Sequence, residues 1–190
     1  MTLRVEGYAI VSADGMLADE TGTMPGSLLI EEDQSFLSSA LDCAALIVHG
    51  RHSHERQPKS PCRKRLIMTR AVRGVSPTSE YPFSLLWNPE FCPLENAAEE
   101  LGVTHGTVAI LGGTNVYGFF LGRYDAFNLS CVPGVRIPLG RAVFPEVPEV
   151  SPRDALAKSG LTMGPSRILD SSNAVTVTVW NRAVERQLAD

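Results

Sequence analysis

Between residues 31 and 121, short apolar segments alternate with segments of helical periodicity. Apolar side chains at helical spacing predict helices over residues 31–42, 93–101 and 114–121. The continuous apolar segments predict buried strands over residues 43–49, 65–69, 84–87 and 107–111. Because strands that alternate with helices usually form a parallel sheet covered on both faces, the chain is expected to have an α/β fold.

The remaining segments add strands at both ends of the chain. Residues 3–11 and 126–132 each predict a strand, and residues 133–152 hold five prolines and predict a loop. Residues 174–180 alternate valine with threonine, which is typical of an antiparallel strand. No repeat or linker divides the 190 residues, so we expect a single domain over residues 1–190.

Composition excludes several classes of protein. With 44% hydrophobic and 20% charged residues, the chain is too apolar for a disordered protein and too poor in charge for a coiled coil. No apolar run reaches the roughly 18–20 residues that span a bilayer, and the first residues do not follow the order of a signal peptide. We therefore expect no membrane contact, a cytoplasmic location and four free cysteines.

Positive charge is concentrated in one segment. Eight of the 17 lysines and arginines lie between residues 51 and 73, where Glu55 is the only acid. In a chain with a net charge of −4, this cluster favours a small polyanion such as a nucleotide phosphate over a nucleic acid. A solvated basic loop is the alternative interpretation.

Gly112 and Gly113 join the strand expected over residues 107–111 to the next helix, which Thr114 is expected to cap. Glycines at such a junction let the backbone approach a phosphate, and a helix N-terminus offers unpaired N–H groups. The alternative is a tight connection without a ligand, because the full G-x-G-x-x-G spacing is absent.

Glu32 is the candidate proton donor. In the expected helix it shares a face with Phe36 and Ala40, so its carboxylate would face apolar neighbours and its pKa would rise. Such a group can give a proton to a substrate near neutral pH. The alternative is that Glu31, Glu32 and Asp33 all decorate an exposed first turn.

Three histidines follow one another closely at positions 49, 52 and 54. Without a cysteine or an acid at ligand spacing they form an unconvincing zinc site, and we expect no metal. Arg51 and Ser53 instead suit a phosphate.

Six short motifs, taken in order, resemble the dihydrofolate reductase superfamily, which includes the reductase domain of riboflavin biosynthesis. They are Ser12-x-Asp14-Gly15, Met24-Pro25, Gly50-Arg51-His52-Ser53, Pro61-Cys62-Arg63-Lys64 before a strand that ends Met68-Thr69-Arg70, Leu111-Gly112-Gly113-Thr114-Asn115-Val116-Tyr117, and Phe144-Pro145. The resemblance implies a three-layer α/β fold. Its central, mostly parallel mixed sheet would have about eight strands with an antiparallel C-terminal strand, flanked by about four helices.

The resemblance also implies an activity, an NADPH-dependent transfer of hydride to a C=N bond of a pterin such as dihydrofolate. Glu32 would be the catalytic carboxylate, Phe36 would line the substrate pocket, and Arg63 would pair with a folate carboxylate. The Gly112–Gly113 peptide would be cis. The cofactor would be bound by Gly50, Arg51, His52, Ser53, Thr69, Arg70, Leu111, Gly112, Gly113, Thr114, Asn115, Val116 and Tyr117.

Two alternatives stay open at this point. Gly26 and Leu29-Ile30 depart from the folate enzymes, and the opening motif at Ser12 resembles the riboflavin branch, whose substrate is a 5-amino-6-(5-phosphoribosylamino)uracil. A non-catalytic nucleotide-binding protein of the same fold is the second alternative. In each case we expect a small-molecule heterocycle as ligand and no nucleic acid, and leave pairing into a homodimer open.

Overall fold

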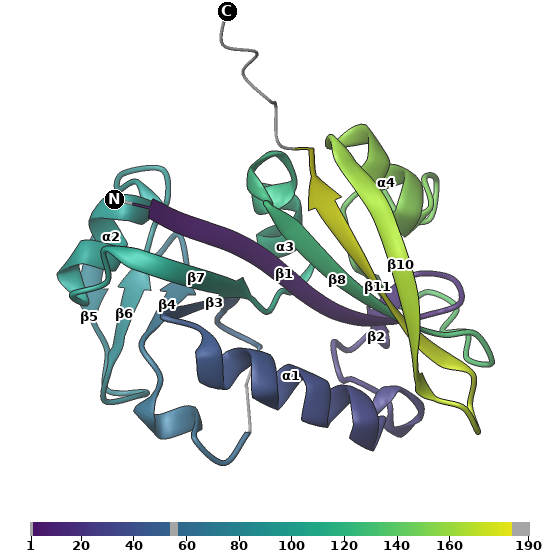
Figure 1. Ribbon diagram of the computed structural model, residues 1–190. Coiled ribbons are helices and arrows are strands. Elements are labelled where there is room, and N and C mark those ends of the chain that lie inside the picture. Colours follow the sequence, from purple (N-terminus) through teal and green to yellow (C-terminus); the bar gives the residue numbers. More distant parts are fainter. Residues whose placement is uncertain (1, 54–56, 184–190) are drawn as a thin grey trace, which may run out of the picture.

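A nine-stranded sheet runs through the whole molecule in the computed structural model, which describes residues 2–53 and 57–183 (Figure 1). Its strand order is β10-β11-β8-β1-β7-β3-β4-β6-β5, and β2 and β9 form a separate pair. The strands are β1 (Thr2–Ser12), β2 (Met16–Ala18), β3 (Leu46–Gly50), β4 (Arg65–Met68), β5 (Val75–Pro77), β6 (Ser84–Trp87), β7 (His105–Ile110), β8 (Ala126–Val132), β9 (Arg141–Ala142), β10 (Leu161–Asp170) and β11 (Val175–Arg182).

The strand directions confirm the expected mixed sheet. From β8 to β6 all neighbours are parallel, whereas β11 and β10 at one end and β5 at the other are antiparallel. β1 lies in the middle, with β7 on one side and β8 on the other. The carboxyl ends of β3, β4 and β7 consequently meet at one edge, where ligands of open α/β sheets bind.

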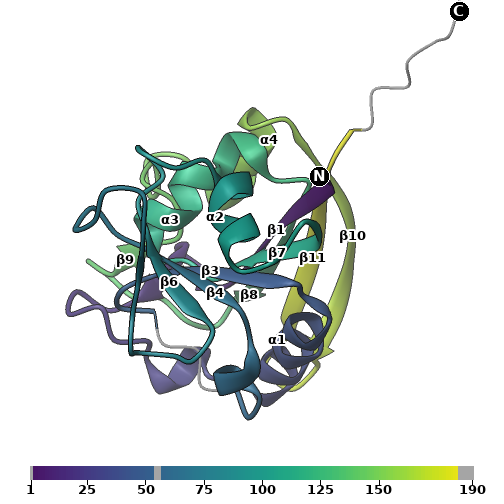
Figure 2. The same cartoon turned by 90° about the vertical axis from the view of Figure 1, so that its left-hand side faces the viewer.

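Four α-helices within the described residues cover the two faces of the sheet (Figure 2). They are α1 (Glu31–Cys43), α2 (Leu94–Glu100), α3 (Thr114–Phe120) and α4 (Pro152–Lys158), with 3₁₀ turns at Gly26–Leu28, Ser60–Cys62 and Leu121–Arg123. α1 lies alone on one face, and α2, α3 and α4 lie on the other.

The pleat of the strands explains this division. Leu46 and Val48 of β3 belong to the large core that includes the buried residues of α2, α3 and α4, whereas Ile47 packs with Leu41 of α1. Successive strand residues point to opposite faces, so a continuous apolar strand serves both layers. The apolar pattern of β3 therefore reflects burial on two sides. The expected start of this strand at residue 43 is wrong, because α1 continues through the exposed Cys43 and the strand begins at Leu46.

The structure adds elements that the sequence patterns did not predict. α4 begins at the last residue of the expected loop, β10 lies in a segment for which no element was expected, and β9 lies within the proline-rich loop. Among the described strands, β10 pairs only with β11, and it exposes most of its side chains, including Met163 and Ile168. An exposed edge strand has no alternation of buried residues to reveal it.

Candidate functional site

A cavity of about 1250 Å³ lies at the carboxyl edge of the sheet, between α1 and α3. Its wall includes Gly50 at the end of β3, Met68 at the end of β4 and Leu111 after β7. Residues from the first turns of α1 and from the middle of β1 close the opposite side. Parallel strand ends, a Gly-Gly turn and a buried helix face thus surround one space.

The Gly112–Gly113 turn forms part of this wall, and its peptide bond is cis, as the resemblance implied. A Cβ on Gly112 would stand 2.2 Å from the Tyr117 ring, and the residue has a φ of +89°. A Cβ on Gly113, by contrast, would have no described atom within 4 Å apart from its chain neighbours. A side chain at position 112 would collide with Tyr117, so packing requires glycine there. A side chain at position 113 would instead project into the cavity.

Thr114 does not cap α3, so that expectation is wrong. Gly113 occupies the cap position, and the Thr114 hydroxyl donates to the carbonyl oxygen of Ala142 at 2.5 Å. Asn115 and Val116 line the cavity as expected for the first turn of α3. The threonine hydroxyl therefore holds the start of α3 against β9.

Tyr117 connects α3 to the first strand. Its hydroxyl donates a hydrogen bond to the carbonyl oxygen of Tyr8, and burial raises the pKa of this phenol, which keeps the donor protonated. Tyr117 lines the cavity and packs edge-on against Phe127 and Phe144. The Gly-Gly turn is thus packed against a rigid aromatic support.

The cations of the basic segment, residues 51–73, have two different surroundings in the structure. Arg51 and Arg70 are exposed and line the cavity together with His52, Ser53 and Thr69. These side chains form a positive, hydroxyl-bearing rim next to the Gly-Gly turn. Arg56 lies outside the described residues.

Other cations of the segment are used in packing. The Arg65 guanidinium is fully buried, stands 4.0 Å from the Tyr81 ring centre and donates to the Ser60 carbonyl at 2.5 Å. His49 is buried beside it, with 3.4 Å between its Nε2 and Arg65 Nη1. These residues stabilise the base of the segment rather than a ligand.

The acid of the cavity is Asp33, and the expected placement of Glu32 is wrong. Glu32 is exposed and absent from the cavity wall, whereas Asp33 is 6% exposed and part of it. α1 turns the stripe Asp33, Leu37 and Leu41 toward the sheet, and Leu41 is 1% exposed. The stripe one residue later than expected carries two leucines, whereas the expected stripe combines Phe36 with the small Ala40, and packing against the sheet decides between them.

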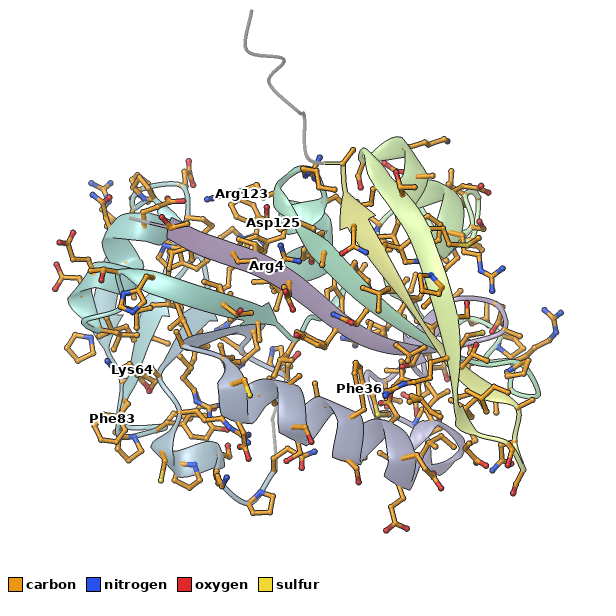
Figure 3. All side chains as sticks on the ribbon, viewed as in Figure 1. Arg4, Phe36, Lys64, Phe83, Arg123 and Asp125 are labelled. Atoms are coloured by element: carbon orange, nitrogen blue, oxygen red, sulfur yellow. The ribbon has the colours of Figure 1, made fainter. Side chains whose placement is uncertain are left out.

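Burial raises the pKa of the Asp33 carboxyl above its ordinary value, and a hydrogen bond with the Ser130 side chain on β8 opposes this in part. Phe36 and Leu37 stand beside it in the cavity wall, as was expected of Phe36. Figure 3 shows Phe36 on the side of α1 that faces the sheet. The site therefore combines one buried acid with apolar side chains from the same helix.

Arg63 does not face the cavity, so its expected role toward a substrate carboxylate is not supported. It is 8% exposed and donates to Asp42 at the end of α1 over 2.6 Å. The residues that line the cavity do not include it. An acid of the chain itself thus occupies the place expected for an acid of the substrate.

The histidines do not assemble into a metal centre in the described part of the chain. No group of three His, Cys, Asp or Glu side chains there could hold a metal ion, and His54 lies outside the described residues. Within these same described residues, no helix has the length and apolarity to cross a bilayer.

No protein-family model and no curated protein sequence matches the chain. Several solved structures, by contrast, match the fold of the chain. Dihydrofolate reductase from Enterococcus faecalis, complexed with NADP(H) and RAB-propyl, superposes with a TM-score of 0.65 at 16% identity, over 95% of this chain and 97% of that one. The chain has the dihydrofolate reductase fold.

Two further structures share the dihydrofolate reductase fold with this chain. A putative riboflavin biosynthesis protein from Shewanella sp. PV-4 has a TM-score of 0.63 at 14% identity, covering 95% of this chain and 99% of the other. A bifunctional deaminase and 5-amino-6-(5-phosphoribosylamino)uracil reductase from Thermotoga maritima has a TM-score of 0.61 at 13% identity. That match covers 96% of this chain and 57% of the Thermotoga protein.

Proposed function

We propose that the protein is an NADPH-dependent reductase that transfers hydride to a C=N bond of a pterin-like heterocycle, the class that includes dihydrofolate. The observation that carries this proposal is the shared cavity, which is lined by the buried Asp33 on one side and by Gly113 and the exposed Arg51 and Arg70 on the other. An acid for the substrate and a cradle for a phosphorylated cofactor thus line one space.

The residues at the Gly-Gly end fit NADPH. The open side of Gly113 leaves room for a pyrophosphate against the backbone, because a side chain there would project into the cavity. Arg51, Arg70 and the hydroxyls of Ser53 and Thr69 would donate to the cofactor's phosphates. When bound, NADPH would supply the hydride, which is chemistry of the nicotinamide itself.

The residues at the α1 end would act on the substrate. Asp33, whose raised pKa favours the protonated form, would give its proton to the substrate nitrogen as the neighbouring carbon is reduced. Ser130 would hold the carboxyl in place, and Phe36 and Leu37 would pack on the ring and exclude water from the reacting bond.

A riboflavin-pathway reductase is the second candidate, supported by the Shewanella and Thermotoga neighbours and by Ser12. The Ser12 hydroxyl, 1% exposed, donates to Asp14 at 2.6 Å and accepts from the Met16 amide at 3.0 Å. The opening motif that resembles this branch is therefore built into the turn between β1 and β2.

Parallel assays separate the candidates. We expect the protein to oxidise NADPH in the presence of a dihydropterin, and turnover of 5-amino-6-(5-phosphoribosylamino)uracil alone would transfer the assignment to the riboflavin pathway. Tight NADPH binding without turnover of either substrate class would instead identify a non-catalytic nucleotide-binding protein. The single domain, the cytoplasmic location and the pairing of two chains stay predictions.

A further inference from the structure

The first strand separates from one of its two neighbours where the cavity begins. In the described sheet, β1 pairs with β7 as far as Gly7, opposite Ile110, whereas its pairing with β8 continues to Ser12 (Figure 1). Tyr8 and Ile10, which follow the last pair with β7, line the cavity. The face of β1 and β8 that carries these side chains therefore forms the wall of the cavity next to the first turns of α1.

Asn128 and Ser130 bring two polar side chains from β8 to this wall. β8 pairs Asn128 with Tyr8 and Ser130 with Ile10, and both polar residues line the cavity although they are only 8% and 2% exposed. Two residues apart on a strand, their Cα atoms are separated by roughly 6.6 Å and their side chains point to the same face. Ser130 contacts Asp33, as described above, and Asn128 lies one pleat further along the same face.

The amide nitrogen of Asn128 is bonded within the protein, whereas its oxygen faces the cavity. Nδ2 donates to the carbonyl oxygen of Gly7 at 3.3 Å. A carbonyl oxygen can only accept, so this bond fixes Nδ2 toward β1 and turns Oδ1 away from it. Among the described residues no donor reaches Oδ1, and this atom is not one of the fully buried atoms without a partner. A hydrogen-bond acceptor of a largely buried residue is thus open to the cavity.

The neighbours of Asn128 on this wall do not supply a donor for its oxygen. An amide oxygen in an apolar setting is unfavourable unless it accepts a hydrogen bond, and buried polar groups are accordingly almost always paired. Tyr8, which lies directly opposite in the sheet, gives its hydroxyl to Glu6 at 2.6 Å. Phe36 and Leu37 of α1 are apolar. An N–H group of a ligand in the cavity can supply the donor.

We propose that Asn128 is a substrate-binding residue whose Oδ1 accepts a hydrogen bond from an N–H group of the heterocycle, while Asp33 acts on the nitrogen of the C=N bond. The inference rests on the proposed reductase function and adds a second polar contact to its substrate. The separation of roughly 6.6 Å between positions 128 and 130 suits polar groups on two edges of one fused ring system. The substrate class is therefore a flat heterocycle that carries an N–H donor apart from the bond to be reduced, as the lactam ring of a pterin does.

This contact predicts a strict requirement for the N–H group. A site that hydrogen-bonds an N–H rejects an analogue without it, because the amide oxygen is then left unpaired. Calorimetry with the full chain measures this without requiring turnover. The probes are 6-hydroxymethyl-7,8-dihydropterin and three derivatives, methylated at N3, at N8 or twice at the 2-amino group.

Asn128→Ala should lower dihydropterin affinity on the order of tenfold and change NADPH affinity less than about threefold. One of the three methylations should weaken binding to the parent protein on the order of tenfold. The same methylation should cost no affinity in Asn128→Ala, because alanine offers neither an acceptor nor an atom for the methyl group to clash with. If Asn128→Ala does not fold, Asn128→Ser takes its place with the same expected results.

Asn128→Asp is the matched control for packing. Aspartate loses the donor to Gly7, as alanine does, but keeps an oxygen for the ligand N–H. It should retain dihydropterin affinity within about threefold and remain sensitive to the same methylation. An equal loss for all four ligands in both variants would assign Asn128 to packing alone and overturn the proposal. Unchanged dihydropterin affinity in a folded Asn128→Ala protein overturns it too, as does a parent protein that does not bind the dihydropterin or tolerates all three methylations.

The two proposals fail in different ways. Dihydropterin binding that depends on Asn128, without oxidation of NADPH, would refute the reductase function and support the role of Asn128. NADPH oxidation by Asn128→Ala with the parent's KM for the dihydropterin would support the reductase and refute the role of Asn128.

Discussion

At residue 33, burial serves the proposed chemistry and opposes the stability of the fold. A carboxyl among apolar neighbours holds its proton to higher pH than an exposed one, so it can act as an acid where most aspartates are ionised. The same burial makes the ionised form unfavourable in the folded protein. Function and stability should therefore respond in opposite directions when this charge is removed.

Asp33→Asn should lower the rate of hydride transfer by on the order of 10²–10⁴, because the amide has no proton to give at the substrate nitrogen. NADPH affinity should stay within about threefold. In the parent protein the single-turnover rate should fall as pH rises through the raised pKa of Asp33. Glu32→Gln is the control, since Glu32 is exposed; a loss of turnover in that variant alone would reassign the acid.

The same substitution should stabilise the protein at neutral pH. Below the ordinary aspartate pKa of 3.8, folded and unfolded chains both hold the Asp33 proton, so this residue adds no pH dependence there. Above it the unfolded chain releases the proton first, and the parent loses stability as pH rises through the folded pKa. Thermal melts should give Asp33→Asn a higher Tm than the parent at pH about 7 and an equal one in acid. A lower Tm at neutral pH would mean that the Ser130 contact outweighs burial.

Arg70 should make the protein prefer NADPH to NADH. An exposed arginine on the cavity rim can donate charge-assisted hydrogen bonds to a 2′-phosphate, and loss of such bonds lowers affinity about tenfold or more. Titration of Arg70→Ala should show this loss for NADPH and unchanged affinity for NADH. Arg73→Ala is the matched control, because Arg73 belongs to the same basic segment but not to the cavity wall. Equal affinities of the parent for both cofactors would exclude this role.

At the scale of the elements, the two glycines in the turn between β7 and α3 have different roles, one in packing and one in cofactor binding. Gly113→Ala should keep the parent Tm within a few degrees but weaken NADPH binding at least about tenfold, because the methyl group enters the cavity. Gly112→Ala should instead lower the stability by about 1–3 kcal/mol, since its Cβ meets the Tyr117 ring at a positive φ. Melts and titrations on both variants distinguish the two effects. A Gly113→Ala protein that binds NADPH normally would reduce the turn to a structural connection.

Elements with a distinct apolar pattern were predictable, and the exposed edge strand was not. β6 and β8 have the bounds expected from their apolar sequences, and α1 differs by one residue at its end. β10 escaped prediction because its side chains are mostly exposed and its register shifts between Met163 and Ser166. An apolar sequence pattern reflects burial, so an edge strand with mostly exposed side chains has no clear pattern from which to predict it.

The candidate site was predictable in its location but not in two of its side chains. Asp33 and Glu32 stand on adjacent helical stripes, both partly apolar, and only packing against the sheet decides between them. Arg63 donates a hydrogen bond to Asp42, which is 21 residues away in the sequence, and no local sequence pattern predicts such a contact. Contacts between distant segments thus determine which side chains face the cavity, and residue spacing alone does not reveal them.

At the scale of the whole molecule, the central position of β1 determines when folding can be completed. Thr2 pairs with His105 and Glu6 with Ala126, so β1 leaves the ribosome before both of its partner strands and waits for them. Such distant pairing slows folding and leaves both edges of an apolar strand exposed to other chains meanwhile. The strand at the centre of the finished sheet is therefore the one most in need of protection by a chaperone during synthesis.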